Sequence, residues 1–291
     1  MKFFRVLLMP LDFIMKYFKA LVFLLIVFLI FSAGGEGENN NANVARIDLI
    51  GPIMQSESFL ENFYELEQNP NIKGILLVIN SPGGAIAPSI EISEAIKRVS
   101  KIKPIVAYAQ GSMASGSYLA GMWANSIIAN KGALLGSIGV ILNGVDISEL
   151  AQKLGVKSQS LKAGDYKEAG TFMRPWNALE KEMLEGLIQE QYKMFVNDVV
   201  QARGLDINNQ GYFAQGRILS AANALEFGLI DEIGSIYEAQ NKLYTLAGIK
   251  EVHWLQKDKF DLYLQKLLGD NIALGIEKAT YRIFNLISRL Y

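Results

Sequence analysis

Short apolar runs alternate with amphipathic stretches through the middle of the chain. The runs of strand length are 44–53, 72–80, 103–109, 126–129 and 137–142. Apolar residues at helical spacing predict helices over 57–68 and 86–100, between the first three of these strands. Because near-continuous apolar strands separated by helices are typical of parallel sheets, the pattern predicts an α/β fold with buried, largely parallel strands.

The pattern in the second half of the chain predicts one long helix followed by shorter helices and a short strand. Residues 178–203 keep apolar positions at helical spacing without an interior Gly–Pro break, which predicts one long helix. A helix at 219–226, a strand-like "LIDEI" and a helix at 235–246 follow. With no internal duplication, the simplest organisation is one domain over 44–250 and a helical extension over 251–291.

The N-terminus carries an apolar run of a different kind. Residues 20–33 contain no charge, so we expect a transmembrane anchor over 20–35, followed by a polar linker over 36–43. The run is shorter than the ~20 residues of a full span, so a cleaved export signal is the rival interpretation. The flanking charges are Lys2, Arg5, Lys16 and Lys19 before the run and Glu36 and Glu38 after it. The positive-inside rule then keeps 1–19 as a cytoplasmic or interfacial arm and exports the rest.

Composition removes several kinds of site. The chain has no cysteine and one histidine, so thiol nucleophiles, disulfides, thiolate metal sites and histidine-rich metal sites are excluded, and no metal or cofactor is predicted. Lys and Arg total 28 against 29 Asp and Glu, without a long basic run. A nucleic-acid partner is therefore unsupported.

Glycine-rich segments stand at the ends of three predicted strands, at 79–84, 112–117 and 136–140. Any one of them could merely terminate a strand. Together they favour one crevice, because open α/β sheets bind ligands at the ends of parallel strands. Acyl-transfer chemistry needs backbone N–H donors at a developing oxyanion, and Gly84 and Gly116 are the natural donors.

Ser115 lies at the predicted strand-to-helix turn and is a candidate nucleophile, although this reasoning leaves Ser112 and Ser117 open. The lone His253 lacks the orienting partner of a triad, and its role stays open. The segment 161–175 holds Lys162 and Lys167 between glycines. Most lysines are solvated surface charges, but one stripped of water can act as a neutral base.

The ordered motifs resemble a known family. "INSPGG", "GSMASGSYLA", "GSIGV", "AGDYKEAG" and "GRILSAANALEFGLIDEIG" are similar, from about residue 44 to 247, to the signal peptide peptidase A (protease IV) family in its short, single-repeat form. The resemblance implies that Ser115 is the nucleophile, Lys167 the base and Ser137 the residue that holds this lysine. It also implies a spiral of ββα units like that of the Clp protease subunit and crotonases.

The same resemblance implies a role. Members form homo-oligomers whose Ser-Lys dyad is shared between protomers, and they degrade hydrophobic peptides such as cleaved signal peptides. We therefore expect a serine endopeptidase anchored once in the bacterial inner membrane, with its catalytic domain on the periplasmic side. The chain departs from the family in "ASGSY", which places Ser117 where glycine is usual, and in "AGDYK" where "SGxYK" is common. Cleavage specificity and protomer number stay open.

Two other functions remain. A crotonase-like acyl-CoA enzyme would share the fold and the oxyanion hole, but it would not need an export anchor. A non-catalytic membrane scaffold would keep the fold without the chemistry.

Overall fold

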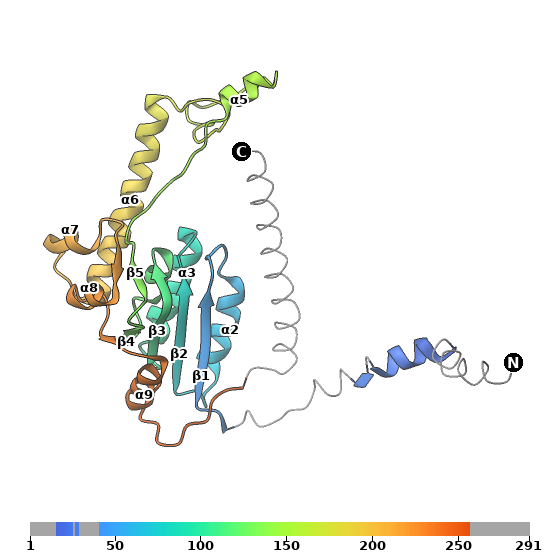
Figure 1. Cartoon of the computed structure of the whole chain (residues 1–291), viewed down its shortest axis with the longest axis vertical. Helices are drawn as coiled ribbons and strands as arrows, with labels where there is room; N and C mark the ends of the chain where they lie inside the picture. Colours follow the sequence, from blue (N-terminus) through green and yellow to red (C-terminus); the bar gives the residue numbers. More distant parts are fainter. Residues whose placement is uncertain (1–15, 26, 29–40, 257–291) are drawn as a thin grey trace, which may run out of the picture. The chain divides into compact units, whose positions relative to one another are not determined.

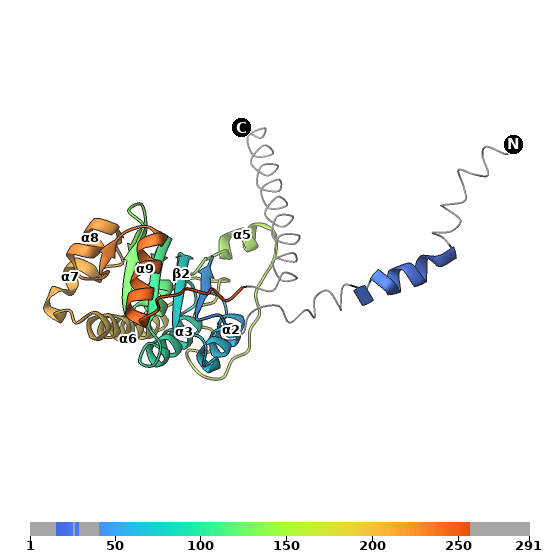
Figure 2. The same ribbon diagram turned by 90° about the horizontal axis from the view of Figure 1, so that it is seen from below.

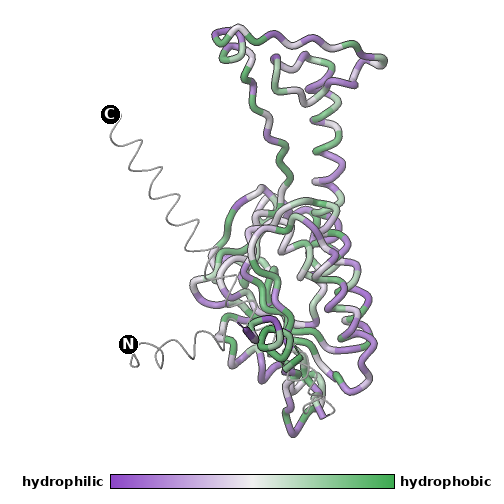
Figure 3. Tube along the Cα trace, turned by 90° about the vertical axis from the view of Figure 1, so that its right-hand side faces the viewer, coloured by the Kyte–Doolittle hydropathy of each residue, from purple (hydrophilic) through white to green (hydrophobic). Residues whose placement is uncertain are grey.

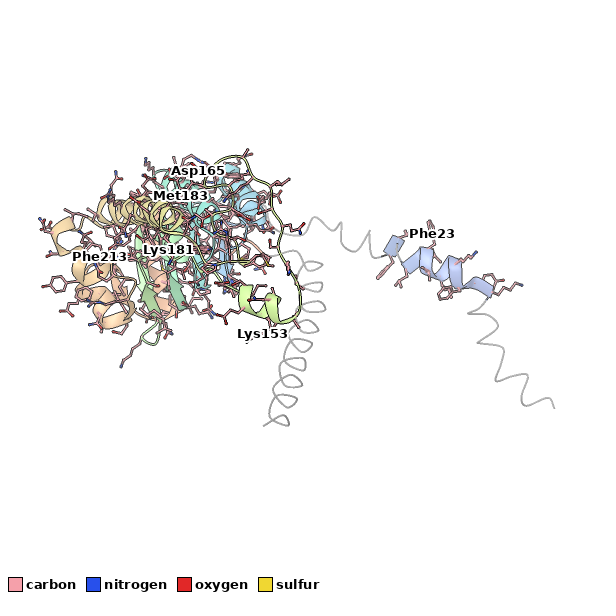
Figure 4. All side chains as sticks on the ribbon, turned by 90° about the horizontal axis from the view of Figure 1, so that it is seen from above. Phe23, Lys153, Asp165, Lys181, Met183 and Phe213 are labelled. Carbon is pink, nitrogen blue, oxygen red and sulfur yellow. The ribbon has the colours of Figure 1, made fainter. Side chains whose placement is uncertain are left out.

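The computed structural model describes residues 16–25, 27–28 and 41–256. Contacts divide the chain into two units, one of which is Asn43–Trp254. In the other unit, residues 16–25 and 27–28 are helical, with Phe23 labelled in Figure 4. Within the described ranges, no helix is long and apolar enough to cross a membrane. The expected anchor over 20–35 is only partly covered, and 29–35, most of the linker and residues 257–291 lie outside the described residues.

A parallel sheet forms the centre of the larger unit (Figure 1). Its strands are β1 (Val44–Ile50), β2 (Gly74–Ser81), β3 (Ile105–Ala114), β4 (Ser126–Ala129), β5 (Leu134–Gly136), β6 (Ile218–Ser220) and β7 (Glu232–Ile233). The main path runs β1-β2-β3-β4-β7 with every pairing parallel. The first half of β3 pairs with β4, while its last three residues pair with β5, which in turn pairs antiparallel with β6.

The helices confirm most of the predicted pattern. They are α2 (Glu57–Gln68), α3 (Ile86–Val99), α4 (Gly116–Gly121), α5 (Ser148–Lys153), α6 (Ala178–Arg203), η2 (Ile207–Asn209), α7 (Gln210–Phe213), α8 (Ala221–Glu226) and α9 (Ile236–Ala247). Helix α6 has the predicted bounds. It begins at a capping box between Asn177 and Glu180, and it ends at Gly204 in the left-handed conformation.

Alternate side chains of the strands enter two apolar layers. Leu76 and Val78 of β2 pack with Val106 of β3 and with Leu243 of α9 on one face. On the other face, Ile79 lies against α4 so closely that a Cβ on Gly121 would be 2.6 Å from its Cδ1. Figure 2 shows α2, α3 and α6 together along one side of the sheet. With both faces covered, β2 is buried almost throughout.

The predicted strand over 137–142 is wrong. Strand β5 ends at Gly136, and Ser137 takes a φ of 48° while its N–H donates to the Arg217 carbonyl at 2.7 Å. Beyond this turn the chain leaves the sheet, and Ile141 is 80% exposed. The apolar run that resembled a buried strand therefore passes from the core at Ile138, which is fully buried, to the surface at Ile141 and Leu142.

Residues 142–177, here called the arm, extend past the carboxyl ends of the strands (Figures 1 and 3). The outgoing and returning segments are clasped where the Trp176 ring covers Gly144, since a Cβ on that glycine would be 2.1 Å from the ring. The Trp176 Nε1–H donates to the Thr171 carbonyl at 2.8 Å, and the Ile147 N–H to the Phe172 carbonyl at 2.9 Å. Hydrophobic and hydrophilic stretches alternate along the arm in Figure 3.

Candidate active site

Ser115 joins the end of β3 to the start of α4 in a strained conformation. Its φ of 53° and ψ of −125° are unusual for a residue with a side chain. The Ser115 N–H donates to the Gly136 carbonyl of β5 at 2.7 Å, and its own carbonyl accepts the N–H groups of Tyr118 and Leu119. Such strain costs about 1–3 kcal/mol, persists only where the surroundings enforce it, and concentrates at functional sites.

Glycines bring the loop after β2 against this turn. A Cβ on Gly83 would lie 2.6 Å from the Gly116 nitrogen, and one on Gly84 would lie 2.0 Å from the Ile53 carbonyl oxygen. A Cβ on Gly116 would meet the Ser89 Oγ at 2.4 Å. Only glycine fits at these close approaches. Gly83, Gly84, Ser115 and Gly116 form one compact group, called the serine corner below.

Two backbone amides of the serine corner are free to bind a ligand. Neither the Gly84 N–H nor the Gly116 N–H donates a hydrogen bond to another group of the described residues. Gly116 begins α4, where an amide has no acceptor within the helix. A Cβ on Gly116 would lie 3.2 Å from the Gly84 nitrogen, so the two amides are neighbours. The structure thus brings the predicted oxyanion donors together beside Ser115.

Ser115 opens onto a cleft of about 430 Å³ that Ser137, Gly139 and Tyr192 also line. A smaller space of about 20 Å³, which Ser115 also lines, is bordered by Gly84, Gly116 and Leu119, among others. That space shares Ile86, Val140 and Gln191 with an aliphatic cleft of about 400 Å³. The serine corner therefore adjoins apolar depressions, and the structure places Ser137 in the same cleft as Ser115.

The other two serines of the motif have different surroundings. Ser117 is 0% exposed. Its hydroxyl accepts the Ala114 N–H at 2.8 Å and lies 2.7 Å from the Ser81 carbonyl oxygen and 2.9 Å from the Ala114 carbonyl oxygen. Ser112 lines neither cleft that contains Ser115. Ser117 is therefore a buried structural tie between β2 and β3, and Ser112 lies outside the clefts that Ser115 lines.

Lys167 lies in a turn of the arm and is exposed. Its backbone N–H donates to the Gly164 carbonyl at 3.3 Å, and it lines neither cleft that contains Ser115. Figure 4 draws the side chains of this region, with Lys153 of α5 and Asp165 of the same turn labelled. The described contacts of one chain do not bring Lys167 to Ser115.

His253 is at the opposite edge of the sheet. Its carbonyl accepts the N–H groups of Asn43 and Val44, at the amino end of β1. Ser115 follows the carboxyl end of β3, which runs parallel to β1 through β2. A histidine there cannot take the proton of Ser115 in the same chain.

Sequence reasoning missed a group of charges at the base of α6. The Arg174 guanidinium donates to both carboxylate oxygens of Glu180, at 2.9 and 2.7 Å, and to Glu168 at 3.1 Å. The only available signal was the capping-box pattern of Asn177 and Glu180. Sequence reasoning also missed a contact that holds α4, the helix after Ser115. The Tyr118 hydroxyl donates to the Leu229 carbonyl at 2.8 Å, and burial raises the pKa of this hydroxyl.

Comparison with known proteins gives the family. The sequence model of peptidase family S49 matches residues 97–250, which is more than half of the chain, and the Clp protease model matches residues 41–135. The chain belongs to peptidase family S49. It is a serine protease with a ClpP-like α/β fold.

Two relatives that each cover most of this S49 chain are named as proteases. A protein of Methanocaldococcus jannaschii named as a protease is 36% identical over 78% of this chain and 74% of its own length. A protein of Enterococcus faecium named as signal peptide peptidase SppA is 33% identical over 80% of this chain and 70% of its own. A solved structure of an alanine mutant of a membrane-bound stomatin-specific protease aligns with a TM-score of 0.50 at 17% identity. It covers 75% of this chain and 99% of the solved one, and it supports the fold alone.

Proposed function

We propose that this protease is a membrane-anchored endopeptidase in which Ser115 is the nucleophile and Lys167 of a neighbouring protomer is the general base. The observation that carries the proposal is the strained Ser115 beside the free amides of Gly84 and Gly116. This arrangement suits a tetrahedral intermediate, because preorganised donors stabilise charge that develops in the transition state.

The reaction would proceed in two halves. The Ser115 Oγ attacks the peptide carbonyl carbon while the neutral Lys167 amine takes the hydroxyl proton, and the oxyanion is held by the Gly84 and Gly116 N–H groups. The lysine then gives its proton to the leaving amine, which leaves an acyl group on Ser115. Water, deprotonated by the same lysine, attacks the acyl carbon, and the serine departs with the proton.

A base delivered by a second copy accounts for the position of Lys167. The arm exposes a set of large apolar side chains, namely Val145, Leu150, Leu154, Val156, Leu161, Tyr166 and Phe172. Exposed apolar patches of this kind mark interaction sites. A neighbouring protomer would cover them and exclude water from Lys167, and desolvation disfavours the charged form of a lysine. Ser137, in the cleft of Ser115, would then hydrogen-bond the incoming amine.

The substrate proposal follows from the clefts. The aliphatic cleft beside the serine corner is lined by Ile86, Ile90, Val140 and Leu187, among others, and suits apolar side chains of an extended peptide. The anchor expected over 20–35 would hold the site at a bacterial inner membrane, where signal peptides are released. The name of the Enterococcus relative agrees with this proposal.

Fluorophosphonate labelling tests the nucleophile. We expect the probe to modify Ser115 in the assembled protein, to fail with Ser115→Ala, and to label Ser112→Ala normally. Digestion of a released signal peptide, mapped by mass spectrometry, should show cuts after small or apolar residues. Labelling of another serine, or cuts mainly after charged residues, would refute the corresponding part of the proposal.

Mixing inactive variants tests the shared dyad. In a ring with one site per interface, a random 1:1 mixture of Ser115→Ala and Lys167→Ala protomers places intact partners at about a quarter of the interfaces. We expect activity to return to that level after subunit exchange. No recovery, with exchange demonstrated, would place both residues in one chain.

A further inference from the structure

The arm and the start of α6 are joined by one guanidinium. Arg174 binds Glu180 through a bidentate pair and binds Glu168 with the Nη2 that it also uses for Glu180. Bidentate pairs fix the orientation of both partners, which a single contact does not. The Arg174 group therefore sets the direction, as well as the distance, between the two carboxylates.

The Glu180 side of this link is rigid. Its carboxylate also accepts the Asn177 N–H at 3.0 Å in the capping box, and its side chain is only 1% exposed. Glu180 belongs to the first turn of α6, a helix of 26 residues whose later part, with Phe195 and Val199, is buried in the domain. A group that binds Glu180 is therefore held in a fixed position relative to the rest of the domain.

Glu168, the other partner of Arg174, follows Lys167 directly in the sequence. The Glu168 carboxylate accepts the Ser160 hydroxyl at 2.5 Å and pairs with Lys162 at 3.4 Å, in addition to Arg174. The turn itself is closed by backbone bonds from Lys167 to Gly164 and from Ala169 to Tyr166. Because this turn is exposed, apolar packing does not hold it in one chain.

We infer that Arg174 is a positioning residue for catalysis: it ties the turn that carries Lys167 to the start of α6 and so sets where the lysine amine meets the neighbouring Ser115. The inference rests on the proposed function. The Arg174–Glu180 pair is only partly exposed, at 33% for the Arg174 side chain and 1% for the Glu180 side chain, and its bidentate geometry fixes the position of the turn relative to α6. A misplacement of about 1 Å at a reacting group can lower a rate by about 10²-fold.

Steady-state kinetics of Arg174→Gln and Arg174→Lys give the first test. We expect kcat of Arg174→Gln to fall by about 10²-fold with KM changed less than about two-fold, because the substrate clefts are untouched. Arg174→Lys keeps the positive charge but lacks the planar guanidinium that binds a carboxylate through two donors. Its kcat should therefore lie between those of wild type and Arg174→Gln.

The matched control is Arg98→Gln. Arg98 makes the same bidentate pair with Glu67, at 3.0 and 2.7 Å, between α3 and α2. Its kcat should stay within about two-fold of wild type, since the pair joins helices that carry no dyad residue. A kcat for Arg174→Gln within about three-fold of wild type, or equal losses for both arginines, would overturn the inference.

Mixed oligomers give the second test and separate the inference from the proposed function. Arg174→Gln protomers should recover activity with Ser115→Ala, which supplies an intact arm, to about a quarter of wild type. They should not recover with Lys167→Ala, because neither protomer then has a working arm. Recovery of activity in the mixture of Arg174→Gln and Lys167→Ala protomers would overturn the inference. If Ser115→Ala and Lys167→Ala fail to complement each other, the shared dyad is refuted instead, and the kinetic comparison with Arg98→Gln decides the role of Arg174.

Discussion

The serine corner and the arm are built in opposite ways. In the serine corner, backbones approach so closely that a methyl group cannot be added, and Ser117 ties the neighbouring strands from a fully buried position. The arm has its proposed base in an exposed turn and is ordered by polar contacts around Arg174. The difference teaches that the proposed nucleophile and oxyanion donors belong to the folded core, whereas the proposed base would depend on assembly.

The largest expected effect separates chemistry from folding. Lys167→Arg keeps a positive charge but cannot accept a proton, so activity should fall by about 10²–10⁴-fold, as with Lys167→Ala. Because Lys167 is exposed in one chain, the denaturation midpoint should not change. Turnover measured on assembled protein and urea unfolding check both statements. If the Lys167→Arg variant kept more than about a tenth of wild-type turnover, lysine would be excluded as the base.

The serine corner should lose activity and stability together. In Gly116→Ala the new Cβ meets the Ser89 Oγ at 2.4 Å, which moves one oxyanion donor and lowers kcat by about 10²–10³-fold. Crowding in a packed site should also cost about 1–3 kcal/mol in the free energy of unfolding. The control is Gly186→Ala on α6, where a Cβ meets nothing within 4 Å. It should gain about 0.5–1 kcal/mol and keep full activity.

A smaller loss of stability is expected when the hydrogen bonds of the buried Ser117 hydroxyl are removed. Ser117→Ala leaves the buried Ala114 N–H without its hydroxyl acceptor, which should cost about 1–3 kcal/mol in the free energy of unfolding. Ser112→Ala, a change at the same strand end, should stay within about 0.5 kcal/mol of wild type. Equal stabilities in urea for the two variants would show that the Ser117 bonds contribute nothing.

The smallest effect is a loss of stability in acid at the junction between the arm and α6. Hydrogen bonds from Arg174, followed by the Asn177 N–H, lower the pKa of Glu180 to about 2 from 4.5. A lowered pKa means that this stabilisation is present above pH 4.5 and is lost as the pH falls toward 2. Tryptophan fluorescence should report this change near Trp176, and Glu180→Gln should flatten it. Glu182→Gln, an exposed change on the same helix, should not alter the titration.

Local patterns predicted most of the fold and half of the site. Apolar positions at helical spacing without an interior Gly–Pro break gave both ends of α6, and glycines at strand ends predicted that Gly84, Gly116 and Ser115 converge. The run over 137–142 was misread because an irregular apolar segment that passes from the core to the surface can have the same composition as a buried strand. The contacts of Arg174 were not predictable, since Glu168 and Glu180 become its neighbours only when the arm folds back onto the start of α6.

The pairing of β5 with β6 has a consequence for the timing of synthesis. Gly136, whose carbonyl holds the Ser115 amide, is aligned with Ile218, and Ser137 is held by Arg217. Contacts between segments so far apart in sequence form late, because a long loop must close first. A growing chain that has reached α4 already contains Ser115 but lacks the strand that steadies it. We expect the serine corner to reach its final geometry only after β6 has emerged from the ribosome.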